Sequence, residues 1–390
     1  MEATADPGRG WRDRRIAVGP WSPDVLTAVL LLVRVLVVVS VAVDVPHFPS
    51  ATATRFHQIA HTGGVPYRDV AVEYPIGELA LIRAVGSWSL GMTRTLLAFV
   101  AFGADLATFA CVAVGWGREA ARRYLLWGAP LLVFIYRRSD PVAVALVVGG
   151  IVASRRGREG RGGALMGLAV LTKLWPAALL PVLVLSGRAR ALRAAVVTCA
   201  AGLAGWVALG GVAGIRQVLS LRDAVGWELE STVGAIVWPL TGEYRYEQGA
   251  NRTGAVPGWA RAVMVALLVG GLAVVWWRAR RASADPAGAP ALVAVAVLLV
   301  LSPVLSPQYV AWLVPWAAIA SLDARRTALL AIPPMAITGG ILALWYLDAP
   351  VGRSTNQILM ILRNATLLPI PAAWFLGQTR DRRGVPTART

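Results

Sequence analysis

The stretch from Gly63 to Gly77 concentrates the side chains that are best suited to proton transfer. It reads Gly-Gly-Val-Pro-Tyr-Arg-Asp-Val-Ala-Val-Glu-Tyr-Pro-Ile-Gly, so the carboxylates of Asp69 and Glu73 stand four residues apart beside two tyrosines. This spacing puts both acids on one face of either a helix or a strand. A carboxylate within hydrogen-bond reach of a hydroxyl can act as a general base, and two like charges this close raise the pKa of one of them. The stretch therefore predicts acid–base chemistry, with a solvated loop neutralised by Arg68 as the alternative.

Two further groups supply positive charge where an anion could bind. Lys173 is the only lysine of the chain and lies in an apolar run, Leu-Thr-Lys-Leu-Trp-Pro. An ammonium inside a membrane segment is costly and marks a functional site, for which a lipid phosphate is the natural partner. A snorkelling lysine is the alternative. Arg137, Arg138 and Asp140 meet at a junction of apolar segments, which fits phosphate binding. A helix N-cap at Ser139 or Asp140 with snorkelling arginines is the alternative.

Residues 222–252 mix charged side chains with aromatic rings, a combination that suits sugar binding because rings stack on sugars and carboxylates accept hydrogen bonds from hydroxyls. An ordered surface loop is the alternative. A Ser-Pro-Gln-Tyr motif that ends at Tyr309 begins a later helix. The candidate substrate-binding residues of all these motifs are Tyr67, Arg68, Tyr74, Arg137, Arg138, Asp140, Lys173, Arg222, Trp227, Glu230, Arg245, Gln308 and Tyr309.

The sequence does not indicate a metal cofactor or a disulfide. The three histidines are His47, His57 and His61, and the last two have the i, i+4 spacing that can bind a metal on a helix. No third ligand accompanies them, so a divalent metal is unsupported. The two cysteines, Cys111 and Cys199, lie within apolar runs, which is typical of small buried residues.

The elements that carry these motifs are apolar segments. Hydrophobic residues make up 57% of the 390 and charged residues 15%, whereas a soluble domain is about half apolar and about a quarter charged. The runs predict an all-α fold, a polytopic transmembrane helical bundle in the cell membrane. The net charge of +17 does not indicate nucleic-acid binding, because the arginines fall in short clusters between apolar runs, as the positive-inside rule describes.

The arginine clusters set the predicted topology. We expect about twelve crossings, beginning with a retained signal anchor at 24–43, plus a re-entrant or interfacial helix at 75–91. A short interfacial helix is expected at 51–62, and a helix break at Lys173. Residues 1–22 and 379–390 are predicted as cytoplasmic tails, the first disordered, around a transmembrane domain at 23–378. The arginine-only clusters then lie inside, and the mixed polar motifs lie outside the cell.

In their order along the chain, the motifs resemble glycosyltransferase family 87, which belongs to the GT-C superfamily of integral membrane enzymes. The resemblance spans roughly residues 24–377. It rests on Gly-Val-Pro-Tyr-Arg-Asp at 64–69, Glu-Tyr-Pro at 73–75, Lys-Leu-Trp-Pro at 173–176, Trp-Glu-Leu-Glu-Ser at 227–231 and Ser-Pro-Gln-Tyr at 306–309. It implies a GT-C-like fold and transfer with inversion from a polyprenyl-phosphate sugar donor, with mannose as the sugar, to a lipid or glycan acceptor. It also implies an acidic base in the first outer loop and cations that stabilise the leaving group.

The sequence departs from the pattern of that family in three places. Similar proteins carry an acid early in the first loop, whereas residues 50–56 read Ser-Ala-Thr-Ala-Thr-Arg-Phe. The usual Tyr-Pro-Pro is Tyr-Pro-Ile at 74–76, and Gln308 stands where some relatives have histidine. The base is therefore open between Asp69, which we place first, and Asp44 or Glu73. A catalytically weakened member is an alternative.

The resulting expectation is an extracytoplasmic sugar transfer whose partners are the lipid donor, the acceptor and membrane lipids. Asp69 would deprotonate the acceptor, and Lys173 with Arg137 or Arg138 would bind the donor phosphate. Glu230 and Arg222 would orient sugar hydroxyls. The rival functions are a secondary transporter, which needs polar residues near the bilayer midplane, and a non-catalytic polyprenyl-lipid-binding protein.

Overall fold

The computed structural model describes residues 24–44, 51–220, 225–247, 250–281, 285–346 and 353–383. Six helical segments in this part of the chain are long and apolar enough to cross a membrane: Val25–Ala42, Leu90–Trp116, Ala189–Leu219, Gly258–Ala279, Arg325–Leu344 and Thr355–Gly377. The chain is therefore a multi-pass membrane protein. Shorter apolar helices accompany these segments, and the count of twelve crossings stays a prediction.

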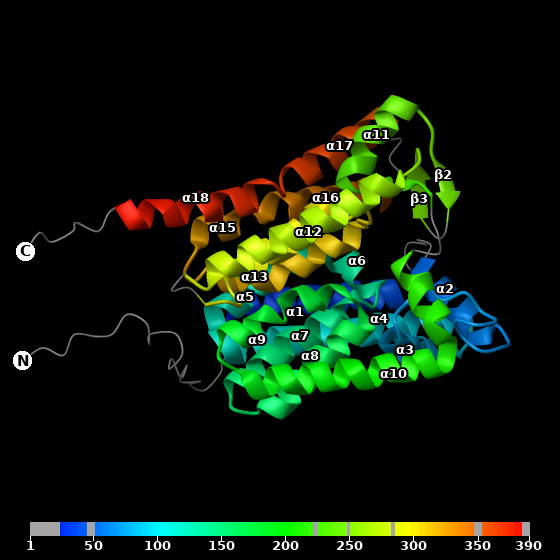
Figure 1. The fold of residues 1–390 in the computed structure, drawn as a ribbon, viewed down its shortest axis with the longest axis horizontal. Coiled ribbons are helices and arrows are strands. Elements are labelled where there is room, and N and C mark those ends of the chain that lie inside the picture. The colour runs from blue at the N-terminus through cyan, green and yellow to red at the C-terminus, as the bar shows by residue number, and fades with distance from the viewer. Residues whose placement is uncertain are drawn as a thin grey trace, which may run out of the picture.

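Helices make up most of the fold. In chain order they are α1 Val25–Ala42, α2 Ala51–His61, α3 Ile76–Gly86, α4 Leu90–Trp116, α5 Arg118–Gly128, α6 Leu132–Tyr136, α7 Asp140–Arg155, α8 Glu159–Thr172, α9 Pro181–Leu185, α10 Ala189–Leu219, α11 Thr232–Thr241, α12 Gly258–Ala279, α13 Ala289–Leu301, α14 Val314–Ala320, α15 Arg325–Leu329, α16 Ile332–Tyr346, α17 Arg353–Ala365 and α18 Pro369–Arg383. Three 3₁₀ helices join them, η1 Ala129–Leu131, η2 Trp175–Leu179 and η3 Pro307–Leu313. Figure 1 shows two layers, one containing α12, α13 and α16 to α18 and the other containing α1, α4, α7, α8 and α10.

The second layer is close-packed because glycines line its helix contacts. A β-carbon on Gly163 of α8 would lie 2.0 Å from the carbonyl oxygen of Ala191 in α10, and one on Gly167 would lie 2.8 Å from that of Ala195. Small residues allow helix backbones to approach closely in a membrane, where packing drives association. The glycine face of α8 therefore fixes where the end of this helix, at Thr172, meets the rest of the bundle.

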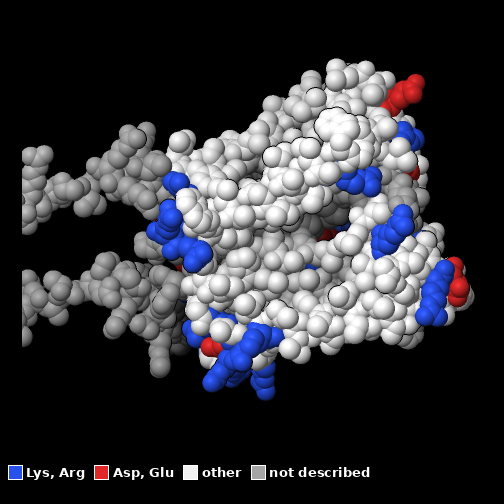
Figure 2. All heavy atoms as spheres, in the orientation of Figure 1, with Lys and Arg blue, Asp and Glu red and all other residues white. Residues whose placement is uncertain are grey.

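The two ends of the bundle differ in character (Figures 1 and 2). We call one the sheet end, because it carries α2 and an antiparallel sheet of three short strands, β1 Trp227–Glu228, β2 Arg245–Glu247 and β3 Ala250–Thr253, in the order β1-β3-β2. The other is the arginine end, where Figure 2 shows several groups of basic side chains and where α5 and α15 each begin with an arginine. The structure is mostly helical, in agreement with the predicted all-α class, and the small sheet is an addition to it. Strands of two to four residues are too short for an alternating pattern to predict them.

A buried ion pair joins α1 to α4 inside the bundle. Arg34 Nε lies 2.9 Å from Asp105 Oδ2, and each side chain is 1% exposed. The hydroxyls of Tyr124 and Tyr136 donate to Asp105 at 2.5 and 2.8 Å. A charge in a bundle interior is tolerated only when it is paired and hydrogen-bonded, so this cluster holds four helices together. No sequence motif predicted this pairing.

Several local predictions are confirmed. A helix occupies Ala51–His61, and the segment from 75 forms α3, although their depth in a membrane stays a prediction. The predicted break at Lys173 is present: α8 ends at Thr172, Lys173 is extended, and Trp175–Leu179 continues as a 3₁₀ helix. The predicted N-terminal tail at 1–22 lies outside the described residues.

Candidate functional site

The break after α8 places Lys173 against a buried acid from α3. Lys173 Nζ lies 2.7 Å from Oε2 of Glu78, whose side chain is fully buried, and the Ser139 hydroxyl donates to the other oxygen. Gly77 allows this approach, since a β-carbon there would lie 2.7 Å from the Leu171 carbonyl. A buried charge without a partner is strongly destabilising, so the pair fixes α3 against the end of α8. The ammonium is thus held in place by Glu78, and it keeps N–H donors for another acceptor.

An aromatic stack orients Asp140. Ser139 occupies the N-cap of α7 without a side-chain cap bond, so its hydroxyl does not make the predicted cap. The indole N–H of Trp312 donates to Asp140 Oδ1 at 2.9 Å. The Trp312 ring stacks on Trp175 and on Tyr309, with centroids 4.7 and 4.3 Å apart. The motifs around 140, 175 and 309, far apart in sequence, therefore meet.

A narrow pocket opens beside this stack, with about 330 Å³ of empty space, part of which is open to solvent. Its polar lining includes Tyr124, Arg138, Asp140 and Gln308, and its apolar lining includes Ile135 and Val144. Arg138 donates to the Thr52 hydroxyl at 2.5 Å and forms no ion pair with any residue that the structure describes. Gln308 is 7% exposed, and its Oε1 has no hydrogen-bond partner within the described ranges. The pocket therefore offers a cation, an acid, a polar acceptor and an apolar wall.

Glu228 of β1 is a second buried acid at the sheet end. It is 5% exposed, its Oε1 accepts from the Ser306 hydroxyl at 2.7 Å, and its Oε2 has no hydrogen-bond partner in the described part of the chain. Burial raises the pKa of Glu228, against the opposing effects of Ser306, Arg252 and Arg138. Arg138 is therefore one of the charges that stabilise the ionised form of this carboxylate. Figure 2 shows a hollow toward this end with acidic and basic atoms inside it.

Glu230, which the sequence predicts as a sugar ligand, is bound to a residue of α17. Arg363 Nη1 lies 2.5 Å from Glu230 Oε2, and Arg363 Nη2 donates to the Glu230 carbonyl at 2.7 Å. Arg363 is fully buried. Burial raises the pKa of Glu230, and Arg363 opposes that effect. The pair links the loop before α11 to the other layer.

The three carboxylates predicted as bases each have a partner near them. Asp69 is exposed and accepts from the backbone N–H of Val65 at 2.7 Å, within its own turn. Glu73 accepts from Arg55 Nε and Nη2, both at 2.9 Å, and Asp44 pairs with an arginine of α4. Neither Asp69 nor Lys173 lines the pocket beside Trp312.

Tyr67 anchors the first loop onto α10. It has a φ of 68°, is 1% exposed, and donates from its hydroxyl to the Tyr74 carbonyl at 2.8 Å. A β-carbon on Gly210 would lie 2.5 Å from Tyr67 Cβ, so glycine makes room for the ring. The Tyr74 ring lies 5.2 Å from Lys173 Nζ, within reach of a cation–π interaction. The exposed Arg68 donates to the Ala208 carbonyl at 3.3 Å.

The remaining predicted residues have other settings. Trp227 and Arg137 are buried, and Arg245 is an exposed residue of β2 that pairs with Glu247 at 3.1 Å. Arg222 lies outside the described residues. The described residues contain no group of three or more metal-binding side chains.

Sequence reasoning missed Glu78, Glu228, Ser306 and Trp312 as members of this site. The signal for Glu78 was available, since an acid inside an apolar segment needs a counter-charge and the chain has one lysine. The roles of Ser306 and Trp312 depend on how η3 packs, which has no signature in the sequence.

Comparison with known proteins adds one family. The model described as Glycosyltransferase family 87 matches residues 71–307, a range that runs from just before α3 to the first residue of η3. It contains Arg138, Lys173 and Glu228. None of the curated proteins matches the chain.

Proposed function

Because the chain belongs to glycosyltransferase family 87, we propose that it transfers a sugar, mannose in the first instance, from a polyprenyl-phosphate donor to a lipid-linked or glycan acceptor. The transfer inverts the configuration at the anomeric carbon. The sheet end faces the extracytoplasmic side, and the arginine end faces the cytoplasm, in accord with the positive-inside rule.

The observation that carries the proposal is the lining of the pocket at the sheet end. Arg138 is a half-buried cation without an ion-pair partner among the described residues, and it stands beside an apolar wall that includes Ile135 and Val144. A guanidinium matches the geometry of a phosphate, and an apolar wall accommodates the first units of a prenyl chain. Arg138 and the apolar wall therefore match the two chemical parts of the donor, while Asp140 of the same lining is held by Trp312.

The reaction needs a base and a stabilised leaving group. The base takes the proton of the acceptor hydroxyl, the hydroxyl oxygen bonds to the anomeric carbon, and the bond from that carbon to the phosphate oxygen breaks. The polyprenyl phosphate leaves with the electron pair. Arg138 opposes the charge that develops on it, and such preorganised electrostatics is often the largest contribution to catalysis. Lys173 does not line this pocket, so its predicted part in binding the phosphate requires a donor that reaches beyond the pocket.

Glu228 joins Asp69 as a candidate for the base. Asp69 stays the prediction from sequence. Glu228 has in its favour burial and an oxygen without a hydrogen-bond partner in the described structure. Ser306 holds its other oxygen, which leaves Oε2 to meet an acceptor hydroxyl once substrate opens the hollow.

The experiment is sugar transfer in proteoliposomes from a labelled polyprenyl-phosphate mannose. Arg138→Ala removes one charge-stabilising donor, and a loss of about 10²–10³ in turnover is expected. The matched control is Arg326→Ala, an exposed arginine at the opposite end. Equal turnover in Arg138→Ala and the wild type would show that the pocket takes no part in the reaction. Transfer from another polyprenyl-phosphate hexose, but not from polyprenyl-phosphate mannose, would show that the donor sugar is not mannose.

One set of contacts favours a second candidate, a protein that binds the donor lipid without turnover. The three predicted bases are all held by neighbours, Asp69 by its own turn, Glu73 by Arg55 and Asp44 by an arginine of α4. Retention of the labelled donor without release of lipid phosphate, in the presence of acceptor lipids, would identify that function.

A further inference from the structure

A second pocket lies at the arginine end, at the opposite pole from the proposed transfer site. It contains about 790 Å³ of empty space, part of which is open to solvent, between the start of α1, α5 and α15. Its lining residues are Leu26, Glu119, Arg122, Arg123, Leu126, Trp127, Ser321, Arg325 and Leu329. Three arginines and one acid therefore share the pocket with leucines and a tryptophan.

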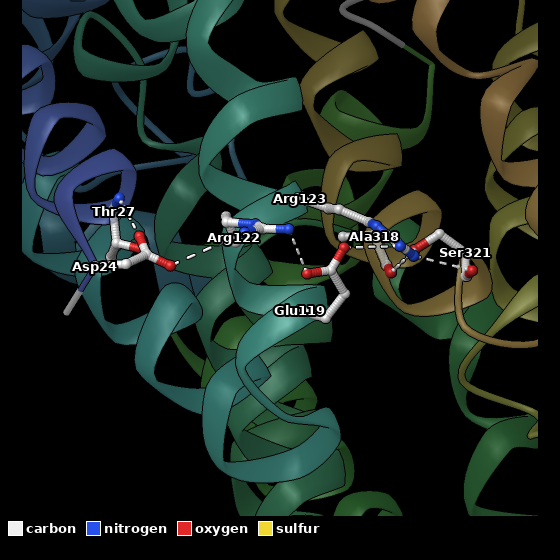
Figure 3. A network of polar contacts seen from close by, with 7 residues as sticks. All are labelled: Asp24, Thr27, Glu119, Arg122, Arg123, Ala318 and Ser321. Atoms are coloured by element: carbon white, nitrogen blue, oxygen red, sulfur yellow. Dashed lines mark hydrogen bonds and ion pairs between the residues drawn. The ribbon is translucent and has the colours of Figure 1, made fainter. Parts of the chain in front are cut away.

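A network of polar contacts holds two of these arginines in place (Figure 3). Glu119 uses both oxygens, one 2.7 Å from Arg122 Nη2 and the other 2.8 Å from Arg123 Nη2. Arg123 Nη1 also donates to the Ser321 hydroxyl at 2.6 Å and to its carbonyl at 3.0 Å. An arginine whose conformation is already fixed loses less entropy when it binds an anion. The network thus prepares a site as well as linking α5 to α14.

Arg325 adds a cation that this network does not neutralise. It is exposed, it lines the pocket, and it forms no ion pair with a residue that the structure describes. Three arginines against Glu119 leave the lining with an excess of positive charge. Asp24, which lies 3.9 Å from Arg122, reduces this excess without cancelling it. The pocket is therefore suited to one phosphate group.

The apolar lining lies beside these charges and is open to the surroundings. Leu26, Leu126 and Leu329 are 44%, 46% and 41% exposed, and Trp127 is half-buried. Tryptophan is enriched where a membrane meets water. A phospholipid carries its phosphate next to its acyl chains. The arginines at the helix ends therefore match the phosphate, and the exposed leucines next to them match an acyl chain.

We propose that this pocket binds one anionic phospholipid of the leaflet at the arginine end. Its phosphate lies between Arg325 and Arg122, and an acyl chain lies along Leu26, Leu126 and Leu329. Basic pockets between membrane helices bind anionic headgroups in this way. The site is separate from the pocket of the sugar donor and does not depend on the proposed reaction.

The test is native mass spectrometry of the full chain released from nanodiscs made of phosphatidylglycerol or of phosphatidylcholine. The wild type should retain one phosphatidylglycerol and no phosphatidylcholine. Arg325→Ala should weaken retention about fivefold, and Arg325→Glu, which changes the charge by two, about 25-fold. Arg326→Ala is the matched control, since Arg326 is the exposed neighbour that does not line the pocket, and it should retain lipid as the wild type does.

Three outcomes would overturn the proposal. One is equal retention of the two lipids by the wild type, and another is an equal effect of Arg325→Glu and Arg326→Glu. The third is full displacement of the lipid by millimolar inorganic phosphate, which would make the pocket a site for the free anion. Size-exclusion elution confirms that each variant is folded, and Arg325 makes no ion pair within the described residues whose loss would unfold it.

Discussion

At the scale of single residues, the two candidates for the catalytic base are carboxylates with different surroundings. Asp69 is exposed and bonded to its own turn, whereas Glu228 is 5% exposed and has one oxygen without a partner in the described structure. Glu228→Gln keeps the bond from Ser306 but cannot take a proton, so turnover should fall by about 10²–10⁴. Asp69→Asn should leave most of the turnover. The opposite pattern in the proteoliposome assay would return the role to Asp69.

The pH dependence of turnover follows from the same burial. Burial raises the pKa of Glu228, and a base works only when it is deprotonated. Turnover should therefore decline on acidification at a pH above the ordinary glutamate value of about 4.3, and be nearly flat above that midpoint. A profile that stays flat down to the ordinary value would show that a solvated acid such as Asp69 is the base.

Lys173 and Glu78 should behave as a unit in stability measurements. Lys173→Met leaves Glu78 as a buried charge without its counter-ion, and about 3–5 kcal/mol of unfolding free energy should be lost. The double variant with Glu78→Gln removes both charges and should recover much of that loss. Thermal unfolding in detergent measures both. Losses that simply add would show that the 2.7 Å contact contributes no coupling.

At the scale of elements, the contact of α8 with α10 depends on the absence of a β-carbon. In Gly163→Ala, the new carbon would meet the Ala191 carbonyl oxygen at 2.0 Å, so α8 must move, and overpacking of this kind costs about 1–3 kcal/mol. Gly160→Ala in the same helix meets nothing within 4 Å and should be neutral or slightly stabilising. A lower unfolding temperature for Gly160→Ala than for Gly163→Ala would contradict the packing argument.

The sequence is informative about elements and much less so about their contacts. Apolar runs predict the membrane helices, and the Lys173 and Pro176 pair predicts the break after α8, because both are local consequences of residue type. The partner of Lys173 depends instead on which face of α3 turns inward, and the pairing of Arg34 with Asp105 depends on how α1 packs against α4. The three strands at the sheet end are held by the antiparallel pairing of β1 with β3 and of β2 with β3. No local sequence pattern predicts this pairing.

At the scale of the whole molecule, the proposed orientation puts the sheet end and the arginine end on opposite sides of the membrane. Tyr246 in β2 is 75% exposed, and Arg326 in α15 is exposed at the other end. In a chain without its own thiols (Cys111→Ala, Cys199→Ala), we introduce Tyr246→Cys or Arg326→Cys. A membrane-impermeant maleimide applied to intact cells should label the first variant, and it should label the second only after permeabilisation, because the arginine clusters favour the cytoplasm. The reversed pattern would place the candidate site inside the cell, and labelling of both variants in intact cells would contradict a chain whose two ends lie on opposite sides.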